Sequence, residues 1–276
     1  ALLKPGDTII IEKPSFFSSM SLFQSMAINV IEVNVDQDGL LTSEIADILE
    51  RRSVSLVLTN PNFQNPTGSQ MSLKRRQELI KLCRMYRLPI IEDDVFGQLV
   101  YDTTERLPLL KQMAPELVIY LGSLSKIMGK KIQIGWICAP NVLLDSVIKI
   151  RDEYESELNV FPQIIATHIL EDTYFFNYLN DLRSYLASQN KCLSELIEKS
   201  YGELMVYHPI KGGYYAWLTV KGRKFTEETW LQLLEKNIGV FPSYLVSEDS
   251  NSCRINLARI NRDEIKMILN ELKNVC

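Results

Sequence analysis

The segment Ile90-Ile91-Glu92-Asp93-Asp94 is a short apolar run that ends in three acidic residues. A charged stretch with helical periodicity, Ser72–Arg87, comes before it, and a second apolar run, Leu117–Gly122, follows it. Apolar runs that alternate with amphipathic helices are typical of parallel sheets, because the connecting helices cover both faces of the strands. The segment and its neighbours therefore predict an α/β layer with a mostly parallel sheet.

The same alternation extends through the first half of the chain. Ala1–Leu3 has the pattern of a helix end, and Pro5-Gly6 has the pattern of a stop and turn. We therefore expect the chain to be the C-terminal part of a longer protein. In all, the apolar runs suited to buried strands are Thr8–Ile11, Asn29–Val35, Ser55–Thr59, Pro89–Asp93, Leu117–Gly122 and Gln133–Cys138.

After Pro140 the pattern changes to helices and then to short alternating elements. We expect a helix to about Glu157 and a long helical stretch from about Gln163 to Ser200, interrupted near Asp172. The last quarter alternates short strands and helices. The chain thus divides into a large domain over residues 1–157, incomplete at its N-terminus, and a connecting helix with a smaller α+β domain over residues 158–276.

Composition excludes several classes of function. The 276 residues carry a net charge of -4, so this part of the chain offers no basic surface for nucleic acid. No run of 18 apolar residues is present, so we expect no transmembrane helix. Five scattered cysteines without a C-x-x-C pair, and only two histidines, predict neither a metal site nor a disulfide framework. We expect free thiols in a cytoplasmic protein.

Two segments with polar chemistry follow predicted strands. Asn60–Gly68 comes directly after Ser55–Thr59, at the strand end where open α/β sheets bind ligands, although it also reads as an ordinary Asn/Pro/Gly loop. Glu92–Asp94 ends the next strand. Its acids could hold Mg²⁺, accept a phosphoryl group, pair with a cationic ring nitrogen, or cap the N-terminus of a helix.

Two further positions carry cationic groups. Lys126 lies between small hydroxyl residues at a strand end, which suits a nucleophile that forms a Schiff base, because such a lysine must lose its proton. The alternative is a solvated surface lysine. Arg254 lies inside an apolar strand of the small domain, where its guanidinium can bind a carboxylate from a ligand or from a structural ion pair.

The order and spacing of four segments resemble the class I/II aminotransferase family of fold-type I pyridoxal-phosphate enzymes. The segments are Asn65–Gly68, Ile91–Asp94, Ser123–Lys126 with Gly135-Trp136, and Arg254. The resemblance runs from Leu2 to about Leu272. Within the family, the chain is similar to aminoadipate/kynurenine-type aminotransferases and to the effector domain of MocR-type (GntR-superfamily) transcription regulators. It implies the α/β fold of fold type I, with the two domains described above.

The resemblance implies pyridoxal 5′-phosphate as cofactor. Lys126 would form the Schiff base with it and would move a proton in a transaminase. Asp93 would pair with the protonated pyridine nitrogen. Asn65 would donate to the phenolic oxygen next to the substrate. Ser123 and Ser125 would contact the phosphate.

Further residues follow from the same resemblance. Phe16 would stack on the cofactor ring, and Arg254 would bind the α-carboxylate of an amino acid. Phe96 stands where the family has a tyrosine that donates to the phenolic oxygen. Gln133 stands where the family has an arginine on the phosphate. Losing that charge-assisted hydrogen bond would weaken binding roughly 10- to 150-fold, unless one of the lysines in Lys130-Lys131 supplies the charge.

These departures lower the expected catalytic efficiency more than they affect the fold. A sensor needs only exchange at the lysine and a change of shape, whereas a transaminase needs the full proton relay. We therefore interpret the chain as the effector-sensing domain of a MocR/GntR-type regulator that recognises an amino acid or amine. We expect a homodimer without membrane contact, with DNA bound only through an N-terminal domain outside this chain.

Two alternatives remain, and a third is excluded. The chain could be a stand-alone amino acid aminotransferase of the 2-aminoadipate/kynurenine type, seen as a fragment. It could be a dimerisation scaffold that binds no cofactor, as Phe96 and Gln133 suggest. A receiver-like Mg²⁺ domain built on Asp93-Asp94 fits neither the length of the chain nor the match that continues after Gly135.

Overall fold

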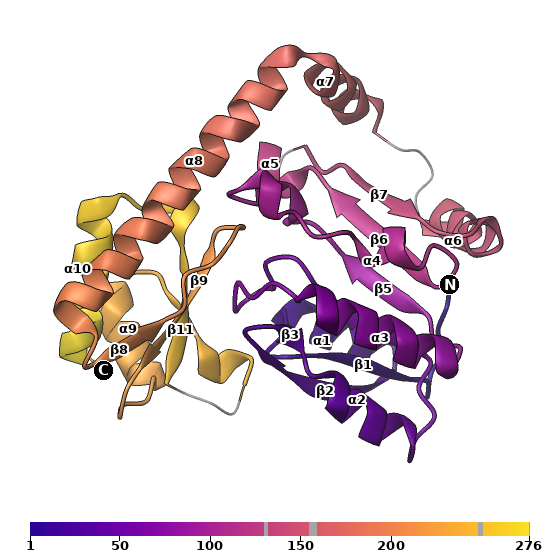
Figure 1. The fold of residues 1–276 in the computed structure, drawn as a ribbon, viewed down its shortest axis with the longest axis horizontal. Coiled ribbons are helices and arrows are strands. Elements are labelled where there is room, and N and C mark those ends of the chain that lie inside the picture. The colour runs from indigo at the N-terminus through magenta and orange to yellow at the C-terminus, as the bar shows by residue number, and fades with distance from the viewer. Residues whose placement is uncertain (130–131, 155–158, 248–250, 276) are drawn as a thin grey trace.

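The structure, a computed structural model, describes residues 1–129, 132–154, 159–247 and 251–275. A seven-stranded sheet in the order β3-β2-β1-β4-β5-β6-β7 occupies one side of the molecule (Figure 1). The five inner strands, β2, β1, β4, β5 and β6, pair in parallel. The two edge strands, β3 and β7, pair antiparallel with their neighbours. The mostly parallel sheet predicted from the sequence is therefore confirmed. The strands are β1 (Thr8–Lys13), β2 (Asn29–Asp36), β3 (Gly39–Leu40), β4 (Leu56–Thr59), β5 (Ile90–Asp93), β6 (Val118–Ser123) and β7 (Gly135–Cys138).

The helices of this part connect consecutive strands. Ser72 begins α3 as its N-cap, and its side chain accepts a hydrogen bond from the backbone N–H of Arg75. The faces of β1 are both buried: Ile10 packs with one apolar cluster, and Ile9 and Ile11 pack with another. This is the burial expected for a central parallel strand. The helices are α1 (Phe17–Ser25), α2 (Thr42–Leu49), α3 (Leu73–Met85), α4 (Leu110–Met113) and α5 (Ser125–Met128).

A second, four-stranded antiparallel sheet follows in the order β10-β11-β9-β8. Its strands are β8 (Met205–Tyr207), β9 (Tyr215–Val220), β10 (Phe241–Pro242) and β11 (Ser252–Asn256). The long helix α8 links this sheet to the first part, and Figure 1 shows it running diagonally across the molecule. The remaining helices are α6 (Asn141–Tyr154), α7 (Val160–Glu171), α8 (Thr173–Leu196), α9 (Glu227–Glu235) and α10 (Arg262–Val275).

Asp172 separates α7 from α8 and caps α8, since its side chain accepts a hydrogen bond from the backbone N–H of Tyr174. The interruption predicted near that residue is therefore confirmed.

Short helices complete the chain. They are the 3₁₀ helices η1 (Gly97–Leu99), η2 (Thr103–Glu105), η4 (Ser243–Leu245) and η5 (Leu257–Arg259), and the π-helix η3 (Ile197–Tyr201).

Two sequence predictions are wrong. Ala1–Leu3 has no helical structure. The run Gln133–Cys138 was expected to be a buried strand, yet every residue of β7 is exposed, with Trp136 at 42%. An edge strand pairs on one side only, and β7 pairs with β6. Apolar composition alone does not distinguish such an edge from a central strand.

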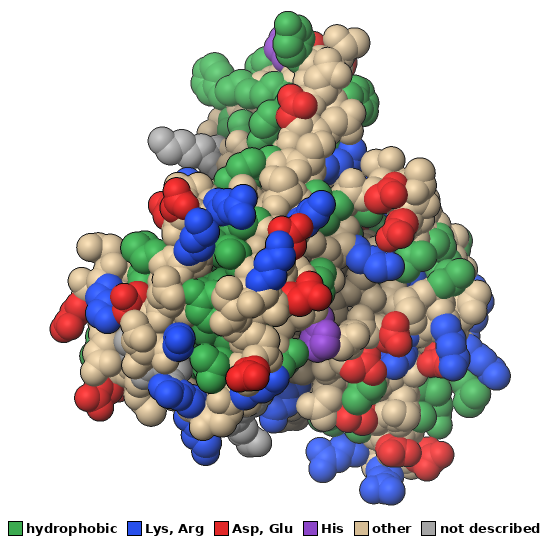
Figure 2. Space-filling view, turned by 60° about the vertical axis from the view of Figure 1, so that its left-hand side comes forward, with side chains coloured by type: hydrophobic (Ala, Val, Ile, Leu, Met, Phe, Trp, Pro, Cys, Tyr) green, Lys and Arg blue, Asp and Glu red, His purple; other side chains and the backbone are tan. Residues whose placement is uncertain are grey.

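The projecting end of the molecule is apolar. Side chains of α7 and of the start of α8 gather there, and Figure 2 shows them at the top of the view, with charges of both signs spread over the rest of that face. Contiguous exposed apolar surface of this kind marks sites of protein association. No helix within the described residues is long and apolar enough to cross a membrane. The exposed residues are Val160, Phe161, Ile164, Ile165, Leu170, Tyr174, Phe176 and Tyr178.

Backbone contacts hold the two sheets in a fixed relation. The N–H of Tyr101 donates to the carbonyl of Lys211, and the N–H of Gly213 donates to the carbonyl of Leu99 (2.9 and 3.0 Å). Gly212 lies at the centre of this contact, because a Cβ there would come within 2.3 Å of the Phe63 ring and 2.6 Å of the Leu99 carbonyl.

Replacing Gly212 by alanine should therefore destabilise the protein. Overpacking against a backbone carbonyl costs about 1–3 kcal/mol of unfolding free energy. Urea denaturation measures the change, and Gly239→Ala is the matched control, because no atom lies within 4 Å of the added Cβ there. Equal stability of the two variants would contradict the close contact with Phe63.

Candidate functional site

The expected site residues lie at the carboxyl ends of the parallel strands of the large sheet. β1, β4, β5 and β6 are parallel neighbours, so their carboxyl ends lie together. Phe16 follows β1, Asn65 follows β4, Asp93 ends β5 and Lys126 follows β6. The sheet also changes its direction of growth between β1 and β4. Open α/β sheets bind ligands outside the strand ends at such a switch point.

The three consecutive acids of β5 and its end have three different surroundings. Glu92 is fully buried, and its carboxylate accepts hydrogen bonds from the backbone N–H groups of Leu110 (2.9 Å) and Lys111 (2.8 Å), the first two residues of α4. Burial raises the pKa of Glu92 to about 7 although these bonds act against it. Glu92 thus binds the N-terminus of α4 from a neighbouring strand and is not its N-cap residue, which is Leu109.

Asp94 belongs to a buried polar network. Its carboxylate accepts from the Asn62 amide (2.6 Å) and from the Tyr120 hydroxyl (3.0 Å). Asn62 in turn accepts from Arg76, which is fully buried and also donates to three backbone carbonyls. A Cβ on Gly97 would lie 2.2 Å from the Asp94 carboxylate, so glycine is required there. The network fixes the start of the loop that carries the next site residue.

Asp93 is the acid that remains for the site. Burial, followed by the charge of Asp94, raises the pKa of Asp93 to about 6, while the N–H of Val95 and the charge of Lys126 act to lower it. The carboxylate is therefore ionised at pH 7 and lies within electrostatic reach of the Lys126 amine. Such a group stabilises a cation placed between the two strand ends.

Lys126 lies in the single turn of α5 against an aromatic surface. Its Nζ is 5.7 Å from the centre of the Phe96 ring, which is buried. The Phe96 ring meets Tyr214 and Tyr215 edge to face, at 5.3 and 5.5 Å between ring centres. The amine therefore has the aromatic face of Phe96 and the charge of Asp93 in its surroundings.

Arg254 lies on β11 of the small sheet. Its Nη1 donates to the Asn65 Oδ1 at 2.6 Å, a contact between the two sheets. Its guanidinium lies 4.0 Å from the Tyr215 ring centre and 4.7 Å from that of Phe241. Burial lowers the pKa of Arg254. The described residues hold no ion pair between Arg254 and a carboxylate, so its partners are an amide and two aromatic faces.

The two serines have local hydrogen bonds at the start of α5. The Ser123 hydroxyl donates to the Ile134 carbonyl (3.3 Å) and accepts from the Ser125 N–H (3.1 Å). These bonds join the turn before Lys126 to the chain that leads into β7.

The other expected residues lie at the rim. Phe16 directly precedes α1 and is 43% exposed. Gln133 is exposed, with a left-handed backbone (φ 48°). Lys130 and Lys131, which could supply a charge in place of the missing arginine, lie outside the described residues. The structure thus groups Asp93, Lys126 and Phe96, and separately joins Asn65 to Arg254.

Several residues around the site were not expected from the sequence. Tyr214 and Tyr215 line it, and the Gly212-Gly213 pair just before them is the only local signal. Glu12 and Gln64 are buried beneath the strand ends, at 4% and 1% exposure. A polar residue that ends an apolar strand is a weak signal, because it becomes informative only when its partners are known.

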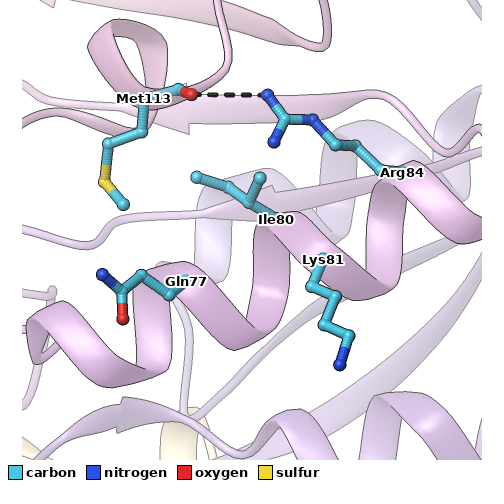
Figure 3. Close-up of a pocket in the computed structure, with 5 residues that line it drawn as sticks. All are labelled: Gln77, Ile80, Lys81, Arg84 and Met113. Atoms are coloured by element: carbon cyan, nitrogen blue, oxygen red, sulfur yellow. Dashed lines mark hydrogen bonds between the residues drawn. The ribbon is translucent and has the colours of Figure 1, made fainter.

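Neither of two pockets in the described part of the chain is lined by Asn65, Asp93, Lys126 or Arg254. One of about 310 Å³ lies on α3 beside α4, where Arg84 donates to the Met113 carbonyl (Figure 3). Another of about 550 Å³ lies between the turn after β1 and the segment 244–247. No cluster of His, Cys, Asp or Glu that could hold a metal ion occurs among the described residues.

Similarity to known proteins agrees with this arrangement. The chain is 28% identical over 256 residues to the HTH-type transcriptional regulator YisV of Bacillus subtilis, covering 92% of this chain and 53% of that protein. It is 25% identical to the aromatic-amino-acid aminotransferase 1 of Thermococcus litoralis, covering 96% of this chain and 65% of that protein. The chain thus spans about half to two thirds of the length of these relatives.

Solved structures share the whole fold. The multiple substrate aminotransferase of Thermococcus profundus superposes with a TM-score of 0.92 at 25% identity, covering 99% of this chain and 70% of the other. The α-aminoadipate aminotransferase LysN of Thermus thermophilus, solved with N-(5′-phosphopyridoxyl)-L-leucine, gives a TM-score of 0.91 at 22% identity, covering 99% and 73%. The fold is therefore that of fold type I, as expected.

The sequence pattern of one family matches almost the whole chain. The family is described as aminotransferase class I and II, and the match covers residues 1–272. Relatives of two kinds, regulators and aminotransferases, match the same region. The chain belongs to the class I and II aminotransferase family.

Proposed function

We propose that this chain is a pyridoxal-phosphate-binding domain that recognises an amino acid or amine, and that it senses this effector within a MocR/GntR-type transcription regulator. The hydrogen bond between Arg254 and Asn65 carries the proposal. It joins the residue expected at the amino acid carboxylate to the residue expected at the cofactor, across two sheets. Ligand binding at the site would therefore affect both the large sheet and the small sheet.

The class I and II aminotransferase fold depends on pyridoxal phosphate, and the residues present fit that group. An ionised Asp93 within electrostatic reach of Lys126 matches a cationic ring nitrogen and an aldehyde. When bound, the cofactor supplies the aldehyde and an electron-withdrawing ring. Lys126 would hold the cofactor through Nζ, which lies beside the Phe96 ring.

The other residues bind and orient. Ser123 and Ser125 would contact the phosphate, and Phe16 would cover the ring. Gln133 stands at the position for a phosphate ligand without its charge. Asn65 would hold the phenolic oxygen through its amide N–H, because its Oδ1 accepts from Arg254. The guanidinium keeps further N–H groups for a carboxylate.

The choice of a regulator over an enzyme rests on Phe96, Gln133 and the similarity to YisV. The alternative is a stand-alone amino acid aminotransferase. The similarity to the Thermococcus litoralis enzyme supports this alternative. We further propose a boundary between the two domains at residue 157, a cytoplasmic location and a homodimer. The exposed apolar end formed by α7 and α8 supports the homodimer. DNA would be bound outside this chain.

Spectroscopy of the full-length protein with bound pyridoxal phosphate tests the choice. A panel of amino acids is added with and without 2-oxoglutarate. A sensor is expected to show a spectral change with a stoichiometric half-reaction at most, and altered DNA affinity. Many turnovers per site would overturn the regulator assignment in favour of the aminotransferase.

A further inference from the structure

Gln64 is a polar side chain with only 1% exposure, directly before Asn65. No role in the proposed site requires it. Its position is specific, since the sheet changes direction between β1 and β4 just beneath it. Burying an amide is unfavourable unless its hydrogen bonds are satisfied, so its partners indicate why it is there.

The amide of Gln64 has partners on two segments of chain. Its Nε2 donates to the carbonyl of Pro14 at 2.7 Å. Its Oε1 accepts from the backbone N–H (3.0 Å) and the hydroxyl (2.7 Å) of Thr67. The same side chain acts to lower the pKa of Glu12, so it also faces that carboxylate. An amide offers two N–H groups and two acceptor directions. Three are filled by Pro14 and Thr67, and the fourth faces Glu12.

Glu12 continues the connection from below. It lies on β1 and accepts from the Thr59 hydroxyl and from the Asn60 N–H (3.1 Å), at the end of β4. Burial is the main cause that raises its pKa, to about 7. The carboxylate thus fixes where the loop leaves β4, and Gln64 fixes where that loop turns over the end of β1.

Two walls of the proposed cofactor site depend on these contacts. Phe16 lies two residues after Pro14, and Asn65 lies between Gln64 and Thr67. Gln64 joins the two walls, because its amide bonds to Pro14 on one side and to Thr67 on the other. We propose that Gln64 is a positioning residue that sets Phe16 and Asn65 at the separation the cofactor ring requires. This inference rests on the proposed function.

Hydrogen exchange on the cofactor-free, full-length protein tests the contact itself. In Gln64→Leu, amides in the segments 13–16 and 63–68 are both expected to exchange about tenfold faster, since both lose their shared partner. Gln232→Leu, on the exposed face of α9, is the matched control and should leave both segments unchanged. Faster exchange in only one segment, or in neither, would overturn the coupling.

Cofactor affinity tests the functional part. Gln64→Leu should bind pyridoxal phosphate about 10- to 100-fold more weakly than the wild type and shift the pH profile of the bound-cofactor absorbance. Thr67→Val should weaken binding in the same direction, and Thr67→Ser, which keeps the hydroxyl, should restore it. This pair decides the matter if Gln64→Leu does not fold. Unchanged affinity in both would overturn the positioning role while the proposed function stands.

The two failures are distinguishable. If the wild type itself binds no pyridoxal phosphate, the proposed function fails and the cofactor role of Gln64 fails with it. Hydrogen exchange still decides, in that case, whether Gln64 couples the two segments.

Discussion

Asparagine at position 93 is expected to stabilise the cofactor-free protein at neutral pH and to weaken its hold on the cofactor. The pKa of Asp93 is raised from 3.8 to about 6 in the folded state, mainly by burial. Between these two pH values the Asp93 carboxyl group is ionised in the unfolded protein and stays protonated in the folded protein. Stability therefore falls as the pH rises through this window. The loss amounts to about 3 kcal/mol at pH 7.

An amide carries no charge at any pH, so Asp93→Asn escapes this loss. Its unfolding free energy relative to the wild type should rise by about 2.4 kcal/mol between pH 4 and pH 7. Urea titrations at several pH values measure it, with Asp47→Asn on the exposed face of α2 as the control. A constant difference across this range would show that the surroundings of Asp93 do not raise its pKa.

The same substitution should reduce affinity for pyridoxal phosphate about 10- to 150-fold. A neutral amide cannot stabilise a protonated ring nitrogen, and hydrogen bonds to charged groups contribute about 1.5–3 kcal/mol. Equilibrium titration with the cofactor measures the loss. Asp93 would thus lower the stability of the empty protein in favour of binding, as functional residues commonly do. Unchanged affinity would remove it from the cofactor site.

Arg254→Leu is expected to abolish most amino acid recognition while leaving cofactor attachment in place. The guanidinium is partly buried, contacts Asn65 and lies between two aromatic rings. Removing one partner of a buried charge pair costs about 2–5 kcal/mol, which corresponds to a 30- to several-thousand-fold loss.

Amino acid titration of the cofactor-loaded protein, followed by absorbance, measures this loss. Arg254→Lys should recover only part of the affinity, because an ammonium cannot make the same two-pronged contact. Arg223→Leu, at an exposed position after β9, serves as the control. A titration of Arg254→Leu that matches the wild type would place the amino acid carboxylate elsewhere.

Much of the fold could be predicted because its strands are local apolar runs. The runs around β1, β2, β4, β5 and β6 agree with the structure to within one or two residues. Some helices escaped prediction: α1 has neither a capping side chain nor an acidic first turn, and α5 is a single turn. The exposure of β7 was also missed, because burial depends on neighbours distant in the sequence.

The site divides in the same way. Asn65, Asp93, Lys126 and Arg254 stand out by residue type and position near strand ends. The separate tasks of Glu92 and Asp94 could not be read from three adjacent acids, because they depend on α4 and on Asn62. The contact between Arg254 and Asn65 spans 189 positions. Sequence thus predicts the groups at strand ends, whereas tertiary packing decides which of them meet.

Borohydride reduction with pyridoxal phosphate, followed by peptide mass mapping, tests the central claim most directly. It is made on this chain and on the full-length protein, with Lys126→Ala as the control. A single reduced adduct on Lys126, absent from the variant, is the predicted result. An adduct in the full-length protein alone would place part of the cofactor site outside this chain. No adduct on Lys126 in either protein would contradict the account and leave a scaffold that binds no cofactor.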